Sequence, residues 1–202
     1  QPESSAASDV YKRQAKAGHA GTLDPIATGV LPIALGEATK TVPYVMDASK
    51  DYHFTLRWGE ARDTDDRDGA VTGEDVHRPT RAAVEAALPR FRGAIRQMPP
   101  KYSALKIAGR RAYDLARQNA EVPLVPREVE VHDFSVDAEL DQDHTRFKVT
   151  SGKGTYMRAL ARDLAVAVGT LGHVAELRRL RVGPFSLDRS ISLDSLKALA
   201  HS

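Results

Sequence analysis

The alternation of apolar and polar residues predicts a strand with one buried face early in the chain. Over residues 52–58 the order is Tyr-His-Phe-Thr-Leu-Arg-Trp, so large apolar side chains recur at every second position. Successive side chains of a strand point to opposite faces, which makes this period typical of a half-buried strand. Residues 129–136 and 145–150 also fit strands, whereas residues 174–182 fit either a helix or a strand.

Helical patterns lie between and after these strands. Thr80 can cap the start of a helix that Pro89 ends. Residues 155–168 place leucine and valine on one face, and Gly169 marks the end of that helix. Two further helices are predicted over residues 110–119 and, after a cap at Ser192, up to residue 200.

The remaining segments favour loops. Residues 16–41 are rich in Gly, Pro, Thr and Ala, with a short apolar piece at residues 30–35 that could be a buried strand. Residues 61–73 are predicted to be an acidic loop, and residues 1–14 match no domain start and are left out of the fold prediction. Strands and helices mix without a regular strand–helix–strand alternation. We therefore predict an α+β fold with a mixed, mostly antiparallel sheet flanked by helices.

Composition narrows the class of protein. The 202 residues are 42% apolar and 28% charged, which suits one domain, or one domain with an insertion. No run of eighteen apolar residues is present, so no membrane span is expected. The chain has no cysteine, which excludes disulfides and thiolate metal sites and fits a cytoplasmic protein.

Charge is segregated although the net charge is only +2. Residues 90–113 carry seven Lys or Arg and no acid, with Tyr102 and Tyr113 among them, and residues 146–181 carry eight bases against two acids. Seven acids gather within residues 60–75. A one-sided positive field suits a polyanion such as RNA or DNA, although solvated helix faces are the plainer interpretation of each run.

Several chemistries are not supported. The chain has no Gly-x-Gly-x-x-Gly and no Gly-x-Ser-x-Gly, and the Gly152-Lys-Gly-Thr155 stretch lacks the residues of a nucleotide-binding phosphate loop. Its seven histidines are scattered without the spacing of metal ligands.

Three stretches can carry chemistry. Asp24 lies in a loop of glycines that ends at Pro25, which can present its carboxylate as a nucleophile or base, although a turn cap is the plainer interpretation of these residues alone. Tyr156 and Arg158 follow the glycines of residues 152–154, where Arg158 could pair with a buried carboxylate or simply lie at the surface. The basic loop at residues 99–106 suits a phosphate backbone, or solvent.

The sequences of these stretches closely resemble the motifs of the TruB family of tRNA pseudouridine-55 synthases, in its bacterial stand-alone form. The resemblance runs from about residue 16 to residue 199 and rests on separate motifs in the family's order, namely Lys16-Ala-Gly-His-Ala-Gly-Thr-Leu-Asp-Pro-Ile-Ala-Thr-Gly-Val-Leu-Pro32, Gly36-Glu-Ala-Thr-Lys40, Asp51-Tyr52, Asp65-Asp-Arg-Asp-Gly69, Tyr102-Ser-Ala-Leu-Lys106, Gly109-Arg-Arg-Ala-Tyr113, Gly152-Lys-Gly-Thr-Tyr-Met-Arg158 and Leu177-Arg-Arg-Leu180.

The resemblance implies an RNA isomerase with the pseudouridine synthase fold and a central RNA-binding cleft. Asp24 would be the essential carboxylate, acting without cofactor or metal on a T-loop uridine of tRNA that is flipped out of its stack. Whether the aspartate attacks the base, attacks the ribose or removes a ribose proton stays open.

The resemblance also assigns roles to further residues. Tyr52 would stack on the flipped base, and Arg158 would pair with Asp24 and hold it ionised. His19 would fill the space vacated in the RNA, supported by Asp66. The pocket walls and other RNA contacts would be Tyr156, Leu177, Lys40, Tyr102 and Lys106.

The implied domain plan has a catalytic domain at residues 15–202 with an RNA-binding insertion at about residues 95–128. Residues 1–14 stand where the family has a Lys-Pro-x-Gly-x-Thr-Ser motif, and the accessory C-terminal RNA-binding domain of many members is expected to be absent. A monomer that binds the T-arm of tRNA is expected. Two alternatives stay open: a non-catalytic tRNA-binding or folding module, and a synthase that depends on a guide RNA.

Overall fold

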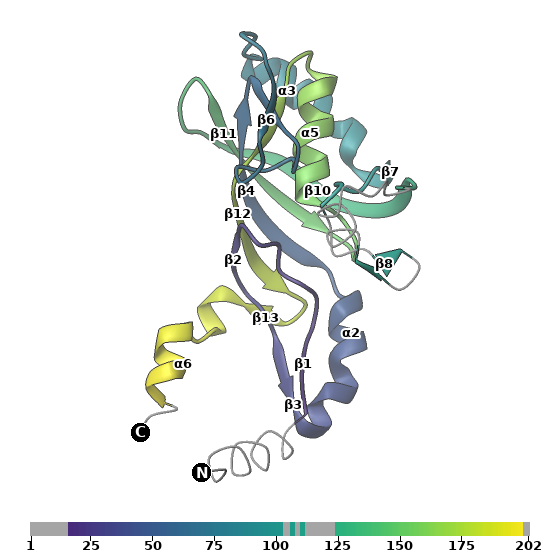
Figure 1. Cartoon of the computed structure of the whole chain (residues 1–202), viewed down its shortest axis with the longest axis vertical. Helices are drawn as coiled ribbons and strands as arrows, with labels where there is room; N and C mark the ends of the chain where they lie inside the picture. Colours follow the sequence, from purple (N-terminus) through teal and green to yellow (C-terminus); the bar gives the residue numbers. More distant parts are fainter. Residues whose placement is uncertain (1–15, 103–105, 108–109, 112–123, 200–202) are drawn as a thin grey trace, which may run out of the picture.

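The central feature of the fold is one twisted sheet. The computed structural model describes residues 16–102, 106–107, 110–111 and 124–199 (Figure 1). Along the sheet the strands run in the order β13-β12-β4-β11-β10-β7, and β2 pairs with β12 beside β13. Every pair is antiparallel except β2 with β12, which confirms the predicted α+β class with a mixed, mostly antiparallel sheet. The strands are β2 (Ala27–Gly29), β4 (Lys50–Trp58), β7 (Gly93–Gln97), β10 (Arg127–Glu139), β11 (His144–Ser151), β12 (Gly172–Val182) and β13 (Phe185–Ser186).

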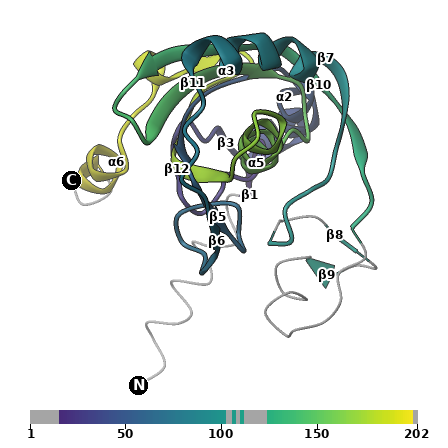
Figure 2. The same ribbon diagram turned by 90° about the horizontal axis from the view of Figure 1, so that it is seen from above.

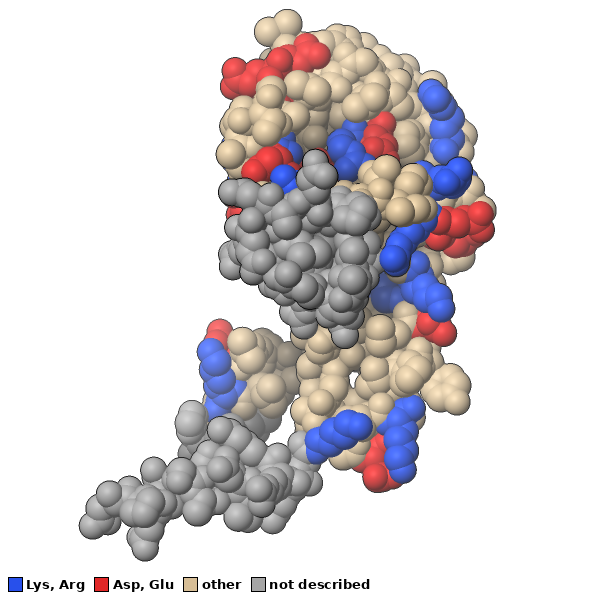
Figure 3. All heavy atoms as spheres, turned by 45° about the vertical axis from the view of Figure 1, so that its right-hand side comes forward, with Lys and Arg blue, Asp and Glu red and all other residues tan. Residues whose placement is uncertain are grey.

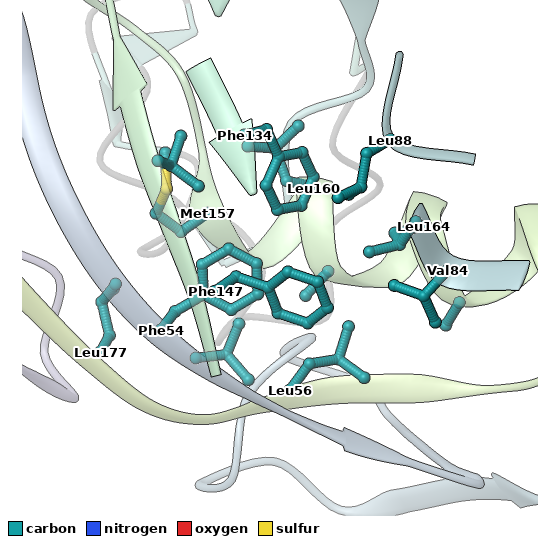
Figure 4. Close-up of a cluster of buried hydrophobic side chains, with 14 of the residues drawn as sticks. Phe54, Leu56, Val84, Leu88, Phe134, Phe147, Met157, Leu160, Leu164 and Leu177 are labelled. Atoms are coloured by element: carbon teal, nitrogen blue, oxygen red, sulfur yellow. The ribbon is translucent and has the colours of Figure 1, made fainter. Parts of the chain in front are cut away.

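The hydrophobic core lies between this sheet and helix α5 (Met157–Ala167). The sheet curves around α5, as the view from above shows (Figure 2). Phe54 and Phe147 stack with ring centroids 5.3 Å apart, and leucines of α5 such as Leu160 point at them (Figure 4). Burying each such side chain stabilises the fold by about 1.5–3 kcal/mol. The core therefore fixes α5, and with it the residues at the N-terminus of α5, against the middle of the sheet.

Helix α3 (Arg81–Ala87) adds a second helix to this core. Its N-terminus is capped as predicted, because Ala83 N–H donates to Thr80 Oγ1 at 3.2 Å. The helix continues into the short turn η2 (Leu88–Phe91), which contains Pro89. Val84 and Leu88 are buried against the same core as α5.

The outer edge of β12 is covered by three separate segments. Strand β13 pairs at Val182, β2 pairs with residues 177–179, and the loop around Asp66 bridges to Val174. Val174 N–H donates to Asp65 O at 3.1 Å, and Arg67 N–H donates to Val174 O at 3.0 Å. Two loops that lie 42 residues apart in sequence, those of Asp24 and Asp66, are thus aligned along a single strand.

The segment predicted as loop at residues 16–41 contains short elements instead. Strands β1 (Ala17–His19) and β3 (Ile33–Leu35) form a two-stranded sheet, followed by the 3₁₀ helix η1 (Gly36–Thr41) and helix α2 (Val42–Asp47), in the lower part of Figure 1. The prediction of a buried strand at residues 30–35 was wrong: Val30 is buried but precedes the strand, and Leu31 is already 38% exposed. Ile33 and Leu35 are 59% and 61% exposed, because a two-stranded sheet offers them no described layer to pack against.

Other elements also differ from the sequence-based prediction. The predicted acidic loop forms a hairpin of β5 (Glu60–Arg62) and β6 (Val71–Glu74), since those residues pair with each other. Residues 110–111, expected to start a helix, form strand β9 (Arg110–Arg111) opposite β8 (Lys106–Ile107), while the rest of that predicted helix lies outside the described residues. Residues 174–182 lie in a strand, β12.

At the C-terminal side, Ser192 caps helix α6 (Leu193–Leu199) as predicted, since Ser195 N–H donates to Ser192 Oγ at 3.1 Å. The 3₁₀ turn η3 (Leu187–Arg189) connects β13 to this helix. None of the helices in the described ranges is both long and apolar enough to cross a membrane.

Candidate active site

Asp24 lies on the turn that leads into β2. Its backbone carbonyl accepts a hydrogen bond from Ala27 N–H at 2.8 Å, which closes the turn just before β2 joins the edge of β12. The side chain is 17% exposed. Its Oδ2 lies 2.8 Å from Nη2 of Arg158, while its Oδ1 is buried and receives no hydrogen bond from the described residues. Arg158 therefore holds one carboxylate oxygen, and the other keeps unused hydrogen-bonding capacity.

Arg158 stands in the first turn of α5 and gathers four partners around one buried guanidinium. Besides Asp24, its Nη1 lies 3.1 Å from Asp66 Oδ2. It also donates to two backbone carbonyls, Thr64 O at 2.9 Å and Tyr102 O at 2.8 Å. The side chain is only 5% exposed, so these contacts compensate the cost of burying its charge. The pairing with Asp24 that the sequence resemblance implied is present in the structure.

The electrostatics of Asp24 are set by opposing effects. Burial raises the pKa of the Asp24 carboxyl, Arg158 lowers it, and the nearby Asp66 raises it again. The net result is a pKa above the ordinary value, because two carboxylates share one cation in a partly dry site. Arg158 therefore acts in the predicted direction, toward the ionised form, but burial has the larger effect.

Asp66 is anchored firmly beside Arg158. The preceding residue, Asp65, adopts a left-handed backbone with φ of 60°, which turns the loop back onto β12. Asp66 Oδ1 accepts hydrogen bonds from Thr64 Oγ1 at 2.6 Å and from Asp68 N–H at 3.0 Å. Both of its oxygens are thus engaged within its own loop and by Arg158. His19, which Asp66 was expected to support, is exposed on β1.

Tyr52 and Leu177 lie on neighbouring strands next to Asp24. Tyr52 packs partly buried against the core, and burial raises the pKa of its phenol. The Arg179 guanidinium lowers that pKa by charge and by a hydrogen bond, while Asp24 raises it. Leu177 is buried on β12, opposite Phe54 of β4 and Ala27 of β2. The structure therefore brings both residues into the surroundings of Asp24.

Tyr156 is held by a residue that the sequence did not single out. It immediately precedes α5 in an extended conformation, so the helix begins at Met157 rather than at residue 155 as predicted. Its N–H donates to Gln97 Oε1 at 2.8 Å, and Gln97 Nε2 donates to its carbonyl at 3.0 Å. Gln97 is buried at the end of β7, so its amide fixes the N-terminus of α5.

The remaining predicted site residues make their described contacts with residues other than Asp24. Lys40 is exposed on η1 and forms an ion pair with Glu37 at 2.6 Å. Tyr102 enters the site through its backbone carbonyl on Arg158. Lys106 belongs to β8, and its side chain lies outside the described residues.

Arg179 is a second residue that sequence analysis missed. It is 2% exposed, and its guanidinium donates to the carbonyls of Gly21, Thr22 and Val30, all in the loop that carries Asp24. In the sequence it follows Arg178 and looks like surface charge. The usable signal was its spacing of two from Leu177, which places both side chains on one face of a strand.

A cavity of about 340 Å³ lies next to β2, β4 and β12. Its lining shares only Leu177 with the predicted site; the other lining residues are Ile26, Thr28, His53, Phe54, Thr55, Arg67, Arg146, Glu176 and Arg178. Among the residues placed in the structure, no group of three or more His, Asp or Glu side chains is arranged to hold a metal ion.

The chain matches two models of one protein family over most of its length. Residues 9–157 match the N-terminal domain of the TruB family pseudouridylate synthases, and residues 158–202 match the tRNA pseudouridylate synthase B C-terminal domain.

Curated relatives carry the same family name. The chain is 59% identical over 184 residues to tRNA pseudouridine synthase B of Bradyrhizobium diazoefficiens, covering 91% of the chain and 53% of that protein. It is 62% identical over 181 residues to the protein of the same name from Gluconacetobacter diazotrophicus, covering 90% and 59%. The chain thus spans between half and three fifths of these two relatives.

Solved structures share the fold. A Cbf5-Nop10-Gar1 complex contains a chain that matches with a TM-score of 0.70 and 30% identity, over 98% of this chain and 50% of that one. An H/ACA RNP bound to a substrate RNA containing 2'-deoxyuridine matches with a TM-score of 0.67 and 25% identity, over 98% and 49%.

Proposed function

The chain belongs to the TruB family of pseudouridylate synthases, and from this premise we propose that it isomerises uridine to pseudouridine at position 55 in the T-loop of tRNA. The observation that carries the proposal is the state of the Asp24 carboxylate. One oxygen is fixed by Arg158, and the other is buried without a hydrogen-bond partner among the described residues.

The proposed reaction needs a positioned carboxylate and a site that admits a flipped base. The bond between uracil N1 and ribose C1′ breaks, the base turns, and a bond from C5 to C1′ replaces it. The hydrogen of C5 leaves and N1 gains one, so the reaction is balanced without an external reactant. A base inside a helical stack is out of reach, so the target nucleotide must be extruded into the pocket.

In this proposal Asp24 acts on the nucleotide, and Arg158 and Asp66 position it. Tyr52 stacks on the base and takes part in removing the C5 proton. Tyr156 and Leu177 wall the pocket, His19 fills the gap left in the RNA, and Lys40, Tyr102 and Lys106 contribute further RNA contacts.

RNA would bind along the segment between β7 and β10. These strands pair from Arg127 with Gln97, so the chain leaves the sheet at residue 98 and returns at residue 126. Lys and Arg side chains form an interrupted row down one edge of the surface in Figure 3. We propose residues 15–202 as a catalytic domain whose insertion at about residues 95–128 contacts phosphates, acting as a monomer in the cytoplasm.

The decisive experiment is tritium release from a T-arm stem-loop RNA that carries 5-tritiated uridine. We expect release by the chain and a loss on the order of 10⁴-fold or more in Asp24→Asn, because the amide cannot act as a nucleophile or base. Asp188→Asn, at an exposed carboxylate of η3, is the matched control and should keep its activity. Release that persists in Asp24→Asn would sink the role of Asp24.

The same assay separates the alternatives. Dependence on a guide RNA is one alternative, which the match to curated tRNA pseudouridine synthase B proteins does not favour. Tritium release from the bare stem-loop, with no guide present, would exclude that candidate. Salt-sensitive binding of tRNA with no pseudouridine formed would instead identify a non-catalytic binding module.

A further inference from the structure

Arg179 is the point to which the Asp24 loop is attached on both sides. Its Nε donates to Val30 O at 2.8 Å, Nη1 to Thr22 O at 3.2 Å and Nη2 to Gly21 O at 3.1 Å. These carbonyls lie before and after Asp24 in sequence. One planar guanidinium thus joins the two ends of a ten-residue loop, which a single point charge could not do.

The backbone of Arg179 holds the same loop. Gly29 pairs with Arg179 in the parallel β2–β12 ladder, and Val30 N–H donates to Arg179 O at 2.9 Å. Gly29 has a φ of +105°, and a Cβ there would lie 2.0 Å from Arg179 O. The loop therefore wraps around one residue so closely that only glycine fits at the contact.

The charge of Arg179 has no carboxylate to balance it. Within the part of the chain that the structure describes, Arg179 forms no ion pair, and its guanidinium is held by neutral carbonyls. A buried cation on neutral partners is costly to stability, so packing alone does not explain an arginine here. Its charge does reach Tyr52, because Arg179 lowers the pKa of the phenol by charge and by a hydrogen bond.

We propose that Arg179 is a positioning residue of the catalytic centre: its guanidinium sets the loop that presents Asp24, and its charge acts on Tyr52, which lies opposite it in the β4–β12 ladder. The proposal rests on the function proposed above and adds a residue to its machinery. Arg158 holds the carboxylate of Asp24 itself, whereas Arg179 holds the backbone on either side of it.

Two substitutions separate the geometry of Arg179 from its charge. Arg179→Lys keeps the positive charge but cannot reach three carbonyls, and Arg179→Met removes both functions. We expect kcat for tritium release to fall about 100-fold in both, with KM for the T-arm stem-loop little changed, because the Asp24 carboxylate is displaced from its attacking position. The pKa of Tyr52, followed by NMR of labelled tyrosine, should rise in Arg179→Met and change less in Arg179→Lys.

The matched control is Arg189→Met, at an exposed arginine of η3 outside the site. It should keep the wild-type kcat and the wild-type Tyr52 pKa. An Arg179→Lys protein that is folded and has the wild-type kcat would overturn the proposal, as would a Tyr52 pKa unaffected by Arg179→Met.

Amide hydrogen exchange keeps the proposal testable if the wild-type chain releases no tritium. Exchange at Ala27 and Val30, whose N–H groups close the loop, should speed up in Arg179→Lys while β4 and β11 stay protected. If the wild-type chain releases no tritium but Arg179→Lys still speeds exchange only at Ala27 and Val30, the proposed function is refuted while the role of Arg179 in positioning the loop is supported. Exchange that rises equally in β4 and β11 marks general destabilisation and refutes the positioning role.

Discussion

At the scale of single residues, Asp24 does not have a cation to itself. Asp24 and Asp66 both contact Arg158, so two carboxylates share one guanidinium. Burial and the nearby negative charge of Asp66 together raise the pKa of Asp24 against the effect of Arg158, which brings its ionisation closer to neutral pH than that of an ordinary aspartate. A carboxylate in this state is a better base and is less stabilised than one with a cation of its own.

Because Asp24 and Asp66 share one cation, the loss of kcat at low pH should depend on Asp66. Asp66→Asn keeps the shape of the side chain but removes the negative charge that raises the pKa of Asp24. Asp24 then stays ionised to lower pH, so the fall of kcat on acidification should move to lower pH. The measurement is kcat for tritium release against pH.

Asp63→Asn is the matched control for this pH profile, because Asp63 lies in the same hairpin and accepts its hydrogen bond from Ala70 N–H. Its profile should coincide with that of the wild type. A limb that moves to higher pH in Asp66→Asn would contradict the assigned sign.

At the scale of elements, β12 organises the site because the loop of Asp24, the loop of Asp66 and helix α5 all contact it. The strand bears β2 along its edge, which makes the close approach at Gly29 necessary. The N-terminus of α5 is set from the other side by Gln97 of β7. Neither contact lies at Asp24, yet each decides where a residue of the centre stands.

Gly29→Ala should weaken the β2–β12 ladder strongly. A Cβ would lie 2.0 Å from Arg179 O at a φ of +105°, so the backbone must shift, and we expect a loss of about 3 kcal/mol or more in the free energy of unfolding. Gly169→Ala is the control, since Gly169 has a φ of +80° but open space around it. It should cost about 1–2 kcal/mol, the strain of the left-handed conformation alone. Equal costs in urea unfolding would show that the contact with Arg179 is unimportant.

Gln97→Leu should disturb the start of α5. It leaves the N–H of Tyr156 without its partner, at about 1–3 kcal/mol, whereas the C=O of Tyr156 still accepts from Leu160 N–H at 3.1 Å. The substitution should lower kcat because Arg158 follows Tyr156 by two residues. Thermal unfolding and tritium release are the two measurements. Gln142→Leu, at an exposed turn residue, is the control and should leave both unchanged. A Gln97→Leu protein with full activity and full stability would show that the hydrogen bonds between Gln97 and Tyr156 do not position α5.

How far the sequence predicted these elements depended on their length. The strand at residues 52–58 and the helix that ends at Gly169 showed a clear period, because their own side chains form the core. Strands β1, β3, β5 and β6 have three or four residues each, too few to show a period, and depend on distant or paired partners. Arg179 was missed for a related reason, since its partners are backbone carbonyls that no sequence pattern displays.

At the scale of the whole molecule, the core and the charge are unevenly distributed. The sheet, α3 and α5 enclose the buried residues, whereas η1 and α2 contain none. Basic residues before and at the start of the segment that leaves β7, such as Arg96 and Lys101, are exposed. The acidic residues of the β5–β6 hairpin lie elsewhere, beside β12. The sequence showed this segregation of charge but not its placement.

The basic residues should determine how tRNA binding depends on salt. Each of Arg96→Gln and Lys101→Gln is expected to reduce the slope of log affinity against log salt concentration by about 1, because one phosphate contact is lost. Arg189→Gln, at an exposed residue of η3, is the control and should leave the slope unchanged. Binding of tRNA that does not vary with salt would place the contact surface elsewhere.

The shared edge of β12 has a consequence for synthesis of the protein on the ribosome. Asp24 is made early, but the strand that supports its loop, with Arg179 in it, is made some 150 residues later. Until residues 172–182 have left the ribosome, the carboxylates of Asp24 and Asp66 have no common strand on which to meet. The candidate site can therefore assemble only once β12 has been synthesised and has joined the sheet.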